Sequence, residues 1–249
     1  MTTENAQSSQ MKFDNVASSN DQVKAFLSAL QLSDSFLPIG SFTRSYGLES
    51  FIQEDVVTDV TELAEVLTSY ITHQVGPCDM VAIHSAYNAA ENQDFDRLAE
   101  VDQYFYSVQL NREFRENSID SGKKLLDLIV ETTNTENLDR LQDMVKNDIM
   151  MGNYPIVLGI VTYEMGLSPR DACLIHSHSF LTGLLGAAQR LMQLSHTDIQ
   201  ALIHDMKKII KESWEMNKHK QIEDIQSFVP FVDIMSMEHE NADLRLFRS

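Results

Sequence analysis

The sequence predicts an all-α fold: one helical domain of about ten helices, with a disordered N-terminal leader and an extended C-terminal tail. Three observations predict it. Glycine and proline are scarce, at 9 and 5 of 249 residues, which disfavours a turn-rich β fold. Apolar residues recur at three- and four-residue spacing along most of the chain. Neither a series of alternating segments nor a repeat of fixed period occurs.

The balance of charge and the use of cysteine limit the function classes. The chain has 19 Lys and Arg against 37 Asp and Glu, a formal net charge of −18, so nucleic acid and anionic membrane are poor ligands. Two distant cysteines, Cys78 and Cys173, form no CxxC pair, as is typical of a reducing cytoplasm. Residues 1–22 are polar and lack the apolar core of a signal peptide. We therefore expect a cytoplasmic protein with a disordered leader.

The first predicted elements alternate clear helices with clear breaks. A short helix begins at Val23, and Pro38 and Gly40 break the chain within 35–40. Helix then resumes over 41–53. The next helix, 60–75, is amphipathic, and Gly76-Pro77 is expected to end it.

The middle of the chain predicts four more helices, listed in order as 80–87, 98–108, 110–130 and 138–149. The polar residues 132–136 form a loop between the last two. Gly152 to Pro155 is the next break. The short β-branched run 156–161 fits a buried strand or a helix ending at Gly166, and the helical context favours the helix.

Two strong start signals precede the last helices. Ser168-Pro169-Arg170-Asp171 combines an N-cap, an N1 proline and an N3 acid, and opens a helix through 172–194. Ser195 is a second N-cap with an acid, Asp198, three residues on, and it precedes an amphipathic helix over 199–214. After Lys220 the pattern fades. We expect the helical domain to span 23–232 and the extended tail 233–249.

Motifs of catalysis and metal binding are missing from the sequence. It holds no P-loop, no GxGxxG, no GxSxG and no HExxH. His176 and His178 are two residues apart, so on a helix they point in different directions. We therefore predict no catalytic residue, no metal site and no cofactor.

A patch of small residues at Gly183, Gly186 and Ala187 allows another helix to approach closely. The partner helix belongs either to the same domain, as a tight crossing, or to a second subunit. The sequence leaves both alternatives open.

Four segments together resemble a known family. The first is 30–49, LQLSDSFLPIGSFTRSYGLE. The second is 152–159, GNYPIVLG, with Ser177, Phe180, Gly183, Ala187, Ala188, Arg190 and Leu191. The third is His239-Glu240 with Arg245 to Ser249, and the fourth is Arg112, Glu113, Arg115, Ser118 and Gly122. Together they are similar to the urease accessory protein UreF family, the fourth segment being the weaker match, and the likeness spans about Ala25 to Ser249.

The resemblance implies a cytoplasmic, all-helical homodimer that is not an enzyme. Such proteins bind a second accessory protein, UreD (also called UreH), recruit the GTPase UreG and act on apo-urease to deliver nickel. The resemblance assigns 237–249 to the UreD/UreH-type partner, with the anchors Glu240, Arg245, Leu246, Phe247, Arg248 and Ser249. We expect the GTPase face at Ser33, Asp34, Arg44, Tyr46 and Glu49.

The residues support this assignment in part. Phe247 lies between two arginines with no local apolar contact, and aromatic and arginine side chains are enriched at binding hot spots. A frayed terminus is the alternative. In 33–49 the alternative is a packing motif in which Pro38 and Gly47 only set the backbone, whereas Arg44 and Glu49 are expected to be exposed.

Two other functions stay open. An arginine finger from Arg44, Arg190 or Arg245 would make the protein a GTPase activator. A nickel carrier would use His239 with Glu238 and Glu240, or Cys78. The distribution of charge indicates where partners bind but does not choose among these functions. Segments 25–48 and 149–189 hold few charged residues, so we expect protein partners to bind there and at the tail. Elsewhere we expect the acidic side chains to form a solubilising surface.

Overall fold

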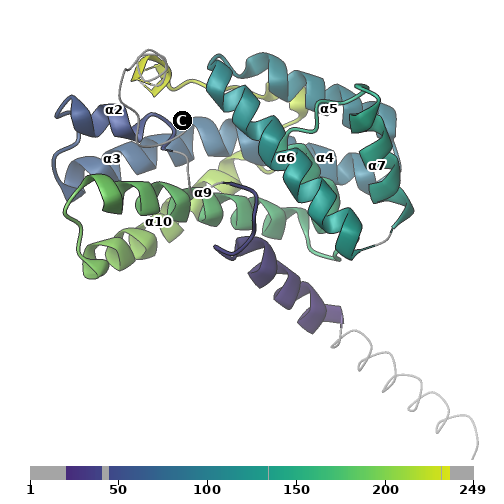
Figure 1. Ribbon diagram of the computed structural model, residues 1–249, viewed down its shortest axis with the longest axis horizontal. Coiled ribbons are helices and arrows are strands. Elements are labelled where there is room, and N and C mark those ends of the chain that lie inside the picture. Colours follow the sequence, from purple (N-terminus) through teal and green to yellow (C-terminus); the bar gives the residue numbers. More distant parts are fainter. Residues whose placement is uncertain (1–20, 41–44, 134, 231, 236–249) are drawn as a thin grey trace, which may run out of the picture.

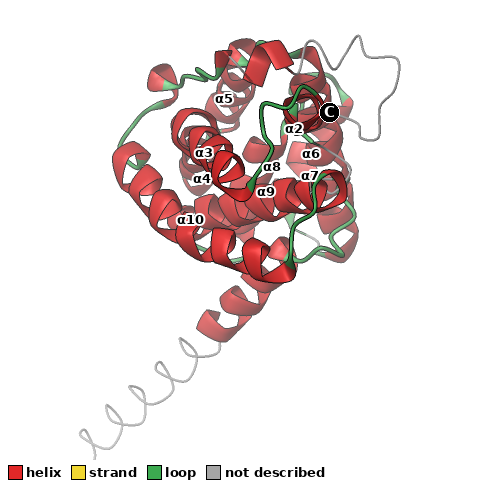
Figure 2. Ribbon diagram, turned by 90° about the vertical axis from the view of Figure 1, so that its left-hand side faces the viewer, coloured by secondary structure: helices red, strands yellow, loops and turns green. Residues whose placement is uncertain are grey.

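The computed structural model describes residues 21–40, 45–133, 135–230 and 232–235. The all-α prediction is confirmed, and these residues contain no β-strand (Figures 1 and 2). The helices are residues 21–33 and α2 (Leu48–Gln53), α3 (Val60–Tyr70), η2 (Ile71–Met80), α4 (Val81–Glu91), α5 (Phe95–Val108), α6 (Arg112–Thr132), α7 (Glu136–Lys146), α8 (Tyr154–Glu164), α9 (Pro169–Leu191), α10 (His196–Asn217) and η3 (Ile222–Asp224). Residue 230 and residues 232–235 are also helical.

The predicted helix starts of α9 and α10 are confirmed by two capping boxes. The Ser168 hydroxyl accepts from the Asp171 amide at 3.1 Å, and Ser195 accepts from Asp198 at the same distance. In both cases the acid accepts from the backbone of the capping serine in return. Each box satisfies backbone donors that the first turn leaves without helical partners.

The prediction that Gly76-Pro77 ends a helix is wrong. α3, η2 and α4 form one continuous helix, and its middle section, Ile71–Met80, widens to a π-helix around Pro77. The wider turn accommodates a residue that has no backbone donor and would clash in a regular helix. Gly76, the residue before Pro77, lies where α10 crosses. A Cβ at this position would lie 2.0 Å from Ser213 Oγ of α10. The glycine therefore allows α10 to cross the widened turn closely.

The predicted helix over 41–53 is shorter in the structure. Residues 41–44 lie outside the described ranges, and Tyr46 (φ 50°) and Gly47 (φ 82°) adopt left-handed backbone conformations. A left-handed backbone cannot continue a right-handed helix. α2 consequently begins only at Leu48.

The core is built around α8, which packs against α4 and α6. Every residue from Tyr154 to Thr162 is buried, which explains why its sequence lacks an amphipathic pattern and also fitted a strand. Gly159 permits the contact with α4, because a Cβ would lie 2.7 Å from the Ile83 carbonyl. The helical alternative for 156–166 is confirmed.

The chain beyond α10 packs on the body rather than leaving it. Ile222, Ile225, Val229, Val232 and Met235 are all buried. The tail expected to be extended over 233–249 is instead helical at residues 233–235, and the rest of it lies outside the described residues. At the other end, the helix beginning at residue 21 projects from the body (Figure 1), so the leader expected over 1–22 is helical at its last two residues.

Candidate functional site

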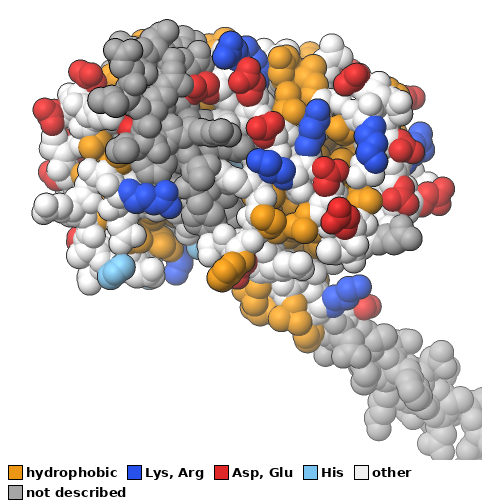
Figure 3. Space-filling view, viewed as in Figure 1, with side chains coloured by type: hydrophobic (Ala, Val, Ile, Leu, Met, Phe, Trp, Pro, Cys, Tyr) orange, Lys and Arg blue, Asp and Glu red, His pale blue; other side chains and the backbone are white. Residues whose placement is uncertain are grey.

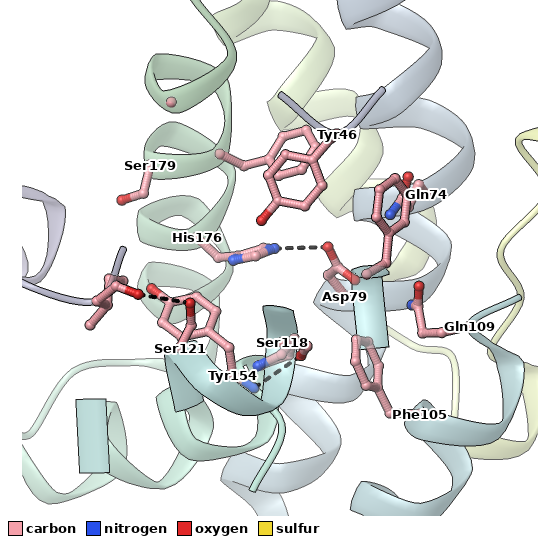
Figure 4. Close-up of a pocket in the computed structure, with 15 residues that line it drawn as sticks. Tyr46, Gln74, Asp79, Phe105, Gln109, Ser118, Ser121, Tyr154, His176 and Ser179 are labelled. Atoms are coloured by element: carbon pink, nitrogen blue, oxygen red, sulfur yellow. Dashed lines mark hydrogen bonds and ion pairs between the residues drawn. The ribbon is translucent and has the colours of Figure 1, made fainter. Parts of the chain in front are cut away.

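A mostly apolar cavity of about 70 Å³, into which several polar side chains project, lies between η2, α6 and α9. Figure 4 shows side chains from these helices and from the turn before α2 converging on it. Its labelled lining residues are Tyr46, Gln74, Asp79, Phe105, Gln109, Ser118, Ser121, Tyr154, His176 and Ser179. The polar groups here are collected from segments far apart in the sequence.

A buried pair of opposite ionisable groups forms one wall of the cavity. His176 Nε2 lies 2.9 Å from Asp79 Oδ2 (Figure 4), and each side chain is only 8% exposed. Buried ionisable groups need such partners, because an unpaired charge would be strongly disfavoured. From the sequence, His176 was considered only as a metal ligand, and Asp79 was not predicted as a site residue. The only sequence signal for such a partner was the uncharged stretch around His176. A histidine buried within that stretch needs a polar partner from a distant part of the chain.

Buried Gln74 adds an acceptor without a partner to the same wall. Its Oε1 makes no hydrogen bond, although the side chain is 4% exposed and lines the cavity. Buried polar atoms without partners are uncommon in folded proteins. The cavity therefore holds a hydrogen-bond acceptor without a partner, Gln74 Oε1, in the same wall as the Asp79–His176 pair.

Aromatic rings form the side of the cavity nearest α2. The Tyr46 ring packs against Phe114 and Phe180 at centroid distances of 5.3 and 4.9 Å. The hydroxyl of Tyr70 donates a hydrogen bond to the Tyr46 carbonyl, which fixes the left-handed turn. Burial and the nearby Asp233 raise the pKa of Tyr70 well above its usual range, so its phenol stays a donor. Tyr46, expected on the GTPase face, is thus a half-buried wall residue.

Three other residues of the expected GTPase face lie apart from the cavity wall. Ser33 donates to the Ala29 carbonyl at 2.8 Å, and exposed Asp34 accepts from the Phe36 amide at 2.7 Å. Glu49 was expected to be exposed, and that expectation is wrong: it is 0% exposed and accepts from Gln53 Nε2. Glu49 lies on the inner side of short helix α2, where the packing of Leu48 and Phe51 also draws it inward. Arg44 lies outside the described residues.

Three of the four segments that carry the family resemblance, 30–49, 112–122 and 152–159, meet at the cavity. The Ser121 hydroxyl donates to the Ile39 carbonyl at 3.0 Å, which joins segment 112–122 to segment 30–49. The Tyr154 amide donates to Ser118 Oγ at 3.2 Å, which joins it to segment 152–159. Gly122 allows this approach, because a Cβ would lie 2.0 Å from the Gly152 carbonyl oxygen.

Asp102 holds the GNYP turn in place. Its buried carboxylate accepts from the amides of Met151, Gly152 and Asn153 at 2.5, 3.1 and 2.9 Å, and from the Asn153 side chain at 2.8 Å. Charged acceptors make the stronger hydrogen bonds of protein interiors. These hydrogen bonds hold the turn in one conformation, which places Tyr154 at the cavity. Asp102 is a further site residue that was not predicted from the sequence.

The root of the C-terminal tail is docked on the π-helix. The Phe228 amide donates to the His73 carbonyl at 3.3 Å, and the Gln226 amide donates to the Pro77 carbonyl at 3.1 Å. The residue four positions after His73 is Pro77, which has no N–H to offer that carbonyl. The anchors expected at Glu240 and 245–249 lie outside the described residues.

The small-residue patch on α9 divides between interior and surface. Ala187 and Gly183 are buried, and Gly183 lines the cavity. Gly186 is half-buried, and a Cβ built there meets nothing within 4 Å. The first two residues fit a crossing within the domain, whereas Gly186 leaves part of the helix uncovered.

The candidate metal ligands are scattered in the described part of the chain. No three His, Cys, Asp or Glu side chains there gather closely enough to hold a metal ion. Cys78 and Cys173 are buried, and burial raises the pKa of both thiols well above the ordinary value. The group Glu238, His239 and Glu240 lies outside the described residues. Among the helices that the structure describes, none has the length and apolar character to cross a membrane.

The fold and the site together define the class: an all-helical protein in which motifs far apart in the sequence surround a buried Asp79–His176 pair. The family model described as UreF matches residues 57–207. Urease accessory protein UreF of Photorhabdus laumondii is 32% identical over 218 residues, 88% of this chain and 95% of that protein. That of Trichodesmium erythraeum is 32% identical over 232 residues, 92% and 98% of the two chains. The chain belongs to the urease accessory protein UreF family.

Proposed function

We propose that this chain is a non-catalytic accessory protein for maturation of the nickel centre of urease. It acts in the cytoplasm as an adaptor that holds a UreD/UreH-type protein, the GTPase UreG and apo-urease together. The relatives' shared name, urease accessory protein UreF, supports the urease link. In this proposal nickel is cargo, and the protein works as a homodimer through its surfaces.

The observation that carries the proposal is the meeting of the family segments at one fixed site. Segments 30–49, 112–122 and 152–159 are tied together by the Ser121 and Tyr154 hydrogen bonds. An adaptor needs binding surfaces that keep fixed positions relative to one another, and these hydrogen bonds between segments hold them so. Of the GTPase face proposed at Ser33, Asp34, Arg44 and Tyr46, Tyr46 lines the cavity at which these segments meet. Glu49, buried on α2, supports that face from within.

The tail supplies the second proposed surface. Its root is held by the hydrogen bonds of Gln226 and Phe228 to the π-helix, so a partner bound to 237–249 would be held close to the body. Arg245, Phe247 and Arg248 supply the residue types that dominate interface energetics.

Co-purification tests the tail. Full-length chain should retain the UreD/UreH-type partner, and a variant lacking 244–249 should lose it. A matched control carries Lys24→Gln in the N-terminal helix, far from the tail in sequence, and should retain the partner. Undiminished capture by the truncated variant would contradict the assignment of the tail.

Single-turnover GTP hydrolysis by UreG distinguishes an adaptor from a catalytic activator. Arg44→Ala, Arg190→Ala and Arg245→Ala should each leave the hydrolysis rate of the bound complex within a few-fold of wild type. Removal of an arginine finger instead lowers such rates by about 10³-fold or more. A loss of that size in one variant would contradict the non-catalytic role.

A further inference from the structure

Half of the lysines of this acidic chain lie in one short stretch that includes the second half of α10. Residues 207–220 contain five of the ten lysines and only two acids, Glu212 and Glu215, whereas the whole chain has a formal net charge of −18. Figure 3 shows acidic and basic side chains interspersed over α5, α6 and α7. The positive charge of 207–220 is therefore concentrated in a way that differs from that part of the surface.

Four basic side chains share one face of α10. At 100° per residue, an arc of about 60° contains His204, Lys207, Lys211 and Lys218. The first three are exposed, and the fourth is half-buried. The buried residues of the helix lie on the other side and are Leu202, Met206, Ile210, Ser213 and Asn217. We call the four basic residues the basic row.

The basic row is unfavourable for the helix that carries it. Lys207 and Lys211 are four residues apart, and like charges at this spacing repel each other. Lys208, beside the row, pairs with Glu212 at 3.8 Å, and Lys218 pairs with Glu215. Among the residues that the structure describes, neither Lys207 nor Lys211 has an ion-pair partner of this kind.

The neighbouring helix adds to this cost. Burial lowers the pKa of His178 on α9, and the charge of nearby Lys207 lowers it further. Lys207 thus has basic side chains as neighbours both along α10 and across to α9. A local arrangement that opposes folding without compensation inside the fold is expected at a functional surface.

The single tryptophan of the chain borders the row. Trp214 lies three residues after Lys211 and four before Lys218, and its half-buried ring packs edge-on against His84 at a centroid distance of 6.4 Å. Tryptophan is enriched among the residues that dominate binding energy, and surrounding charges steer an oppositely charged partner. The face therefore combines an aromatic contact with directional charge.

The size and the charge of the row select its occupant. From Lys207 to Lys218 the row is about 16 Å long, on a chain that is otherwise strongly acidic. A nucleic acid or a membrane presents an extended negative surface, which the rest of this chain would repel. An acidic helix of a protein is narrow enough to lie along the row alone, because its carboxylates can repeat at the same three- and four-residue spacing.

We propose that the basic row of α10, together with Trp214, binds an acidic segment of a partner protein. Carboxylates lying along the row relieve the repulsion between Lys207 and Lys211. This surface is separate in sequence from the GTPase face and the tail. It goes beyond the proposed function, because the argument rests on the charge of α10 and not on the identity of the partner.

Calorimetric titration of the full chain with short poly-L-glutamate at low salt tests the row. Wild type should bind the peptide, and Lys207→Glu with Lys211→Glu should weaken binding at least about 10-fold, because both positions then repel it. The matched control, Lys24→Glu with Lys146→Glu, makes the same change in net charge at two other exposed lysines and should bind like wild type. Equal losses in the two variants would overturn the row, since binding would then follow net charge alone.

Stability gives an independent readout. Lys207→Gln should raise the urea midpoint of unfolding, because it removes a repulsion, and should weaken peptide binding at the same time. A lower midpoint with unchanged binding would show that Lys207 serves the fold, and would overturn its role in the row.

Two comparisons test the kind of occupant. A DNA duplex or phosphatidylserine vesicles that bind more tightly than poly-L-glutamate would assign the row to another class of partner and overturn the proposal. Light scattering should give the same oligomeric state for wild type and for Lys207→Glu/Lys211→Glu. A difference would assign the row to a contact between copies of this chain and would also overturn the proposal.

Discussion

At the cavity, the structure of the interior depends on contacts between single residues. Asp79 and His176 are 97 positions apart in the sequence and meet at 2.9 Å with almost no solvent access. Removing one member of such a pair leaves the other buried without its partner. No local pattern links the two positions, which is why the sequence predicted helices around them and not the pair itself.

Asp79→Asn should lower the free energy of unfolding by about 2–4 kcal/mol, because the amide cannot replace the carboxylate opposite His176. Urea unfolding followed by the fluorescence of Trp214, the single tryptophan, measures it. The control Asp96→Asn removes an exposed acid in the first turn of α5 and should cost no more than about 0.5 kcal/mol. Equal stability of the two variants would show that the Asp79–His176 pair contributes nothing.

His84 makes stability depend on pH. Burial lowers its pKa below the ordinary value of 6.5, so the unfolded chain takes up a proton before the folded chain does. The stability that neutral His84 contributes is complete above about pH 6.5 and is lost as pH falls below it. Wild type should therefore lose more stability than His84→Gln between about pH 7.5 and pH 5.5 in urea titrations. Parallel losses in the two proteins would contradict this.

Helices were predicted well where their signals were local. Short stretches of sequence contain the capping boxes of α9 and α10 and the amphipathic spacing of α3. η2 was mispredicted because a Gly-Pro pair normally ends a helix, whereas here contacts with α10 and with residues 226–228 stabilise a widened turn. Such tertiary contacts override local propensity, and they cannot be found from a single sequence.

Gly76→Ala tests the close crossing of α10 over η2. The added Cβ would lie 2.0 Å from Ser213 Oγ, and that hydroxyl is held by a 3.0 Å hydrogen bond to the Ile71 carbonyl. We expect a loss of about 1–3 kcal/mol in unfolding free energy from overpacking. Gly186→Ala, where the Cβ meets open space, should be neutral or raise stability by up to about 1 kcal/mol through helix propensity. Equal effects at the two glycines would contradict the crossing.

Across the whole molecule, most acidic side chains lie outside the segments that we propose as partner surfaces. Segments 25–48 and 149–189 carry few charges, and the structure brings parts of both to the cavity and to the neighbouring hollow. The fold class and the family could be predicted from composition, periodicity and four ordered motifs. The inward position of Glu49 and the docking of 221–235 could not, because both arise from packing between distant helices.

The most direct test of the adaptor role is the nickel content and activity of urease made with and without this chain. The urease subunits, UreG, the UreD/UreH-type protein and the remaining accessory proteins are co-expressed with the full chain, with the variant lacking 244–249, or with neither. We predict nickel-loaded, active urease only with the full chain, and apo-urease in the other two cultures. Fully loaded, active urease in the culture lacking the chain altogether would contradict the proposed function.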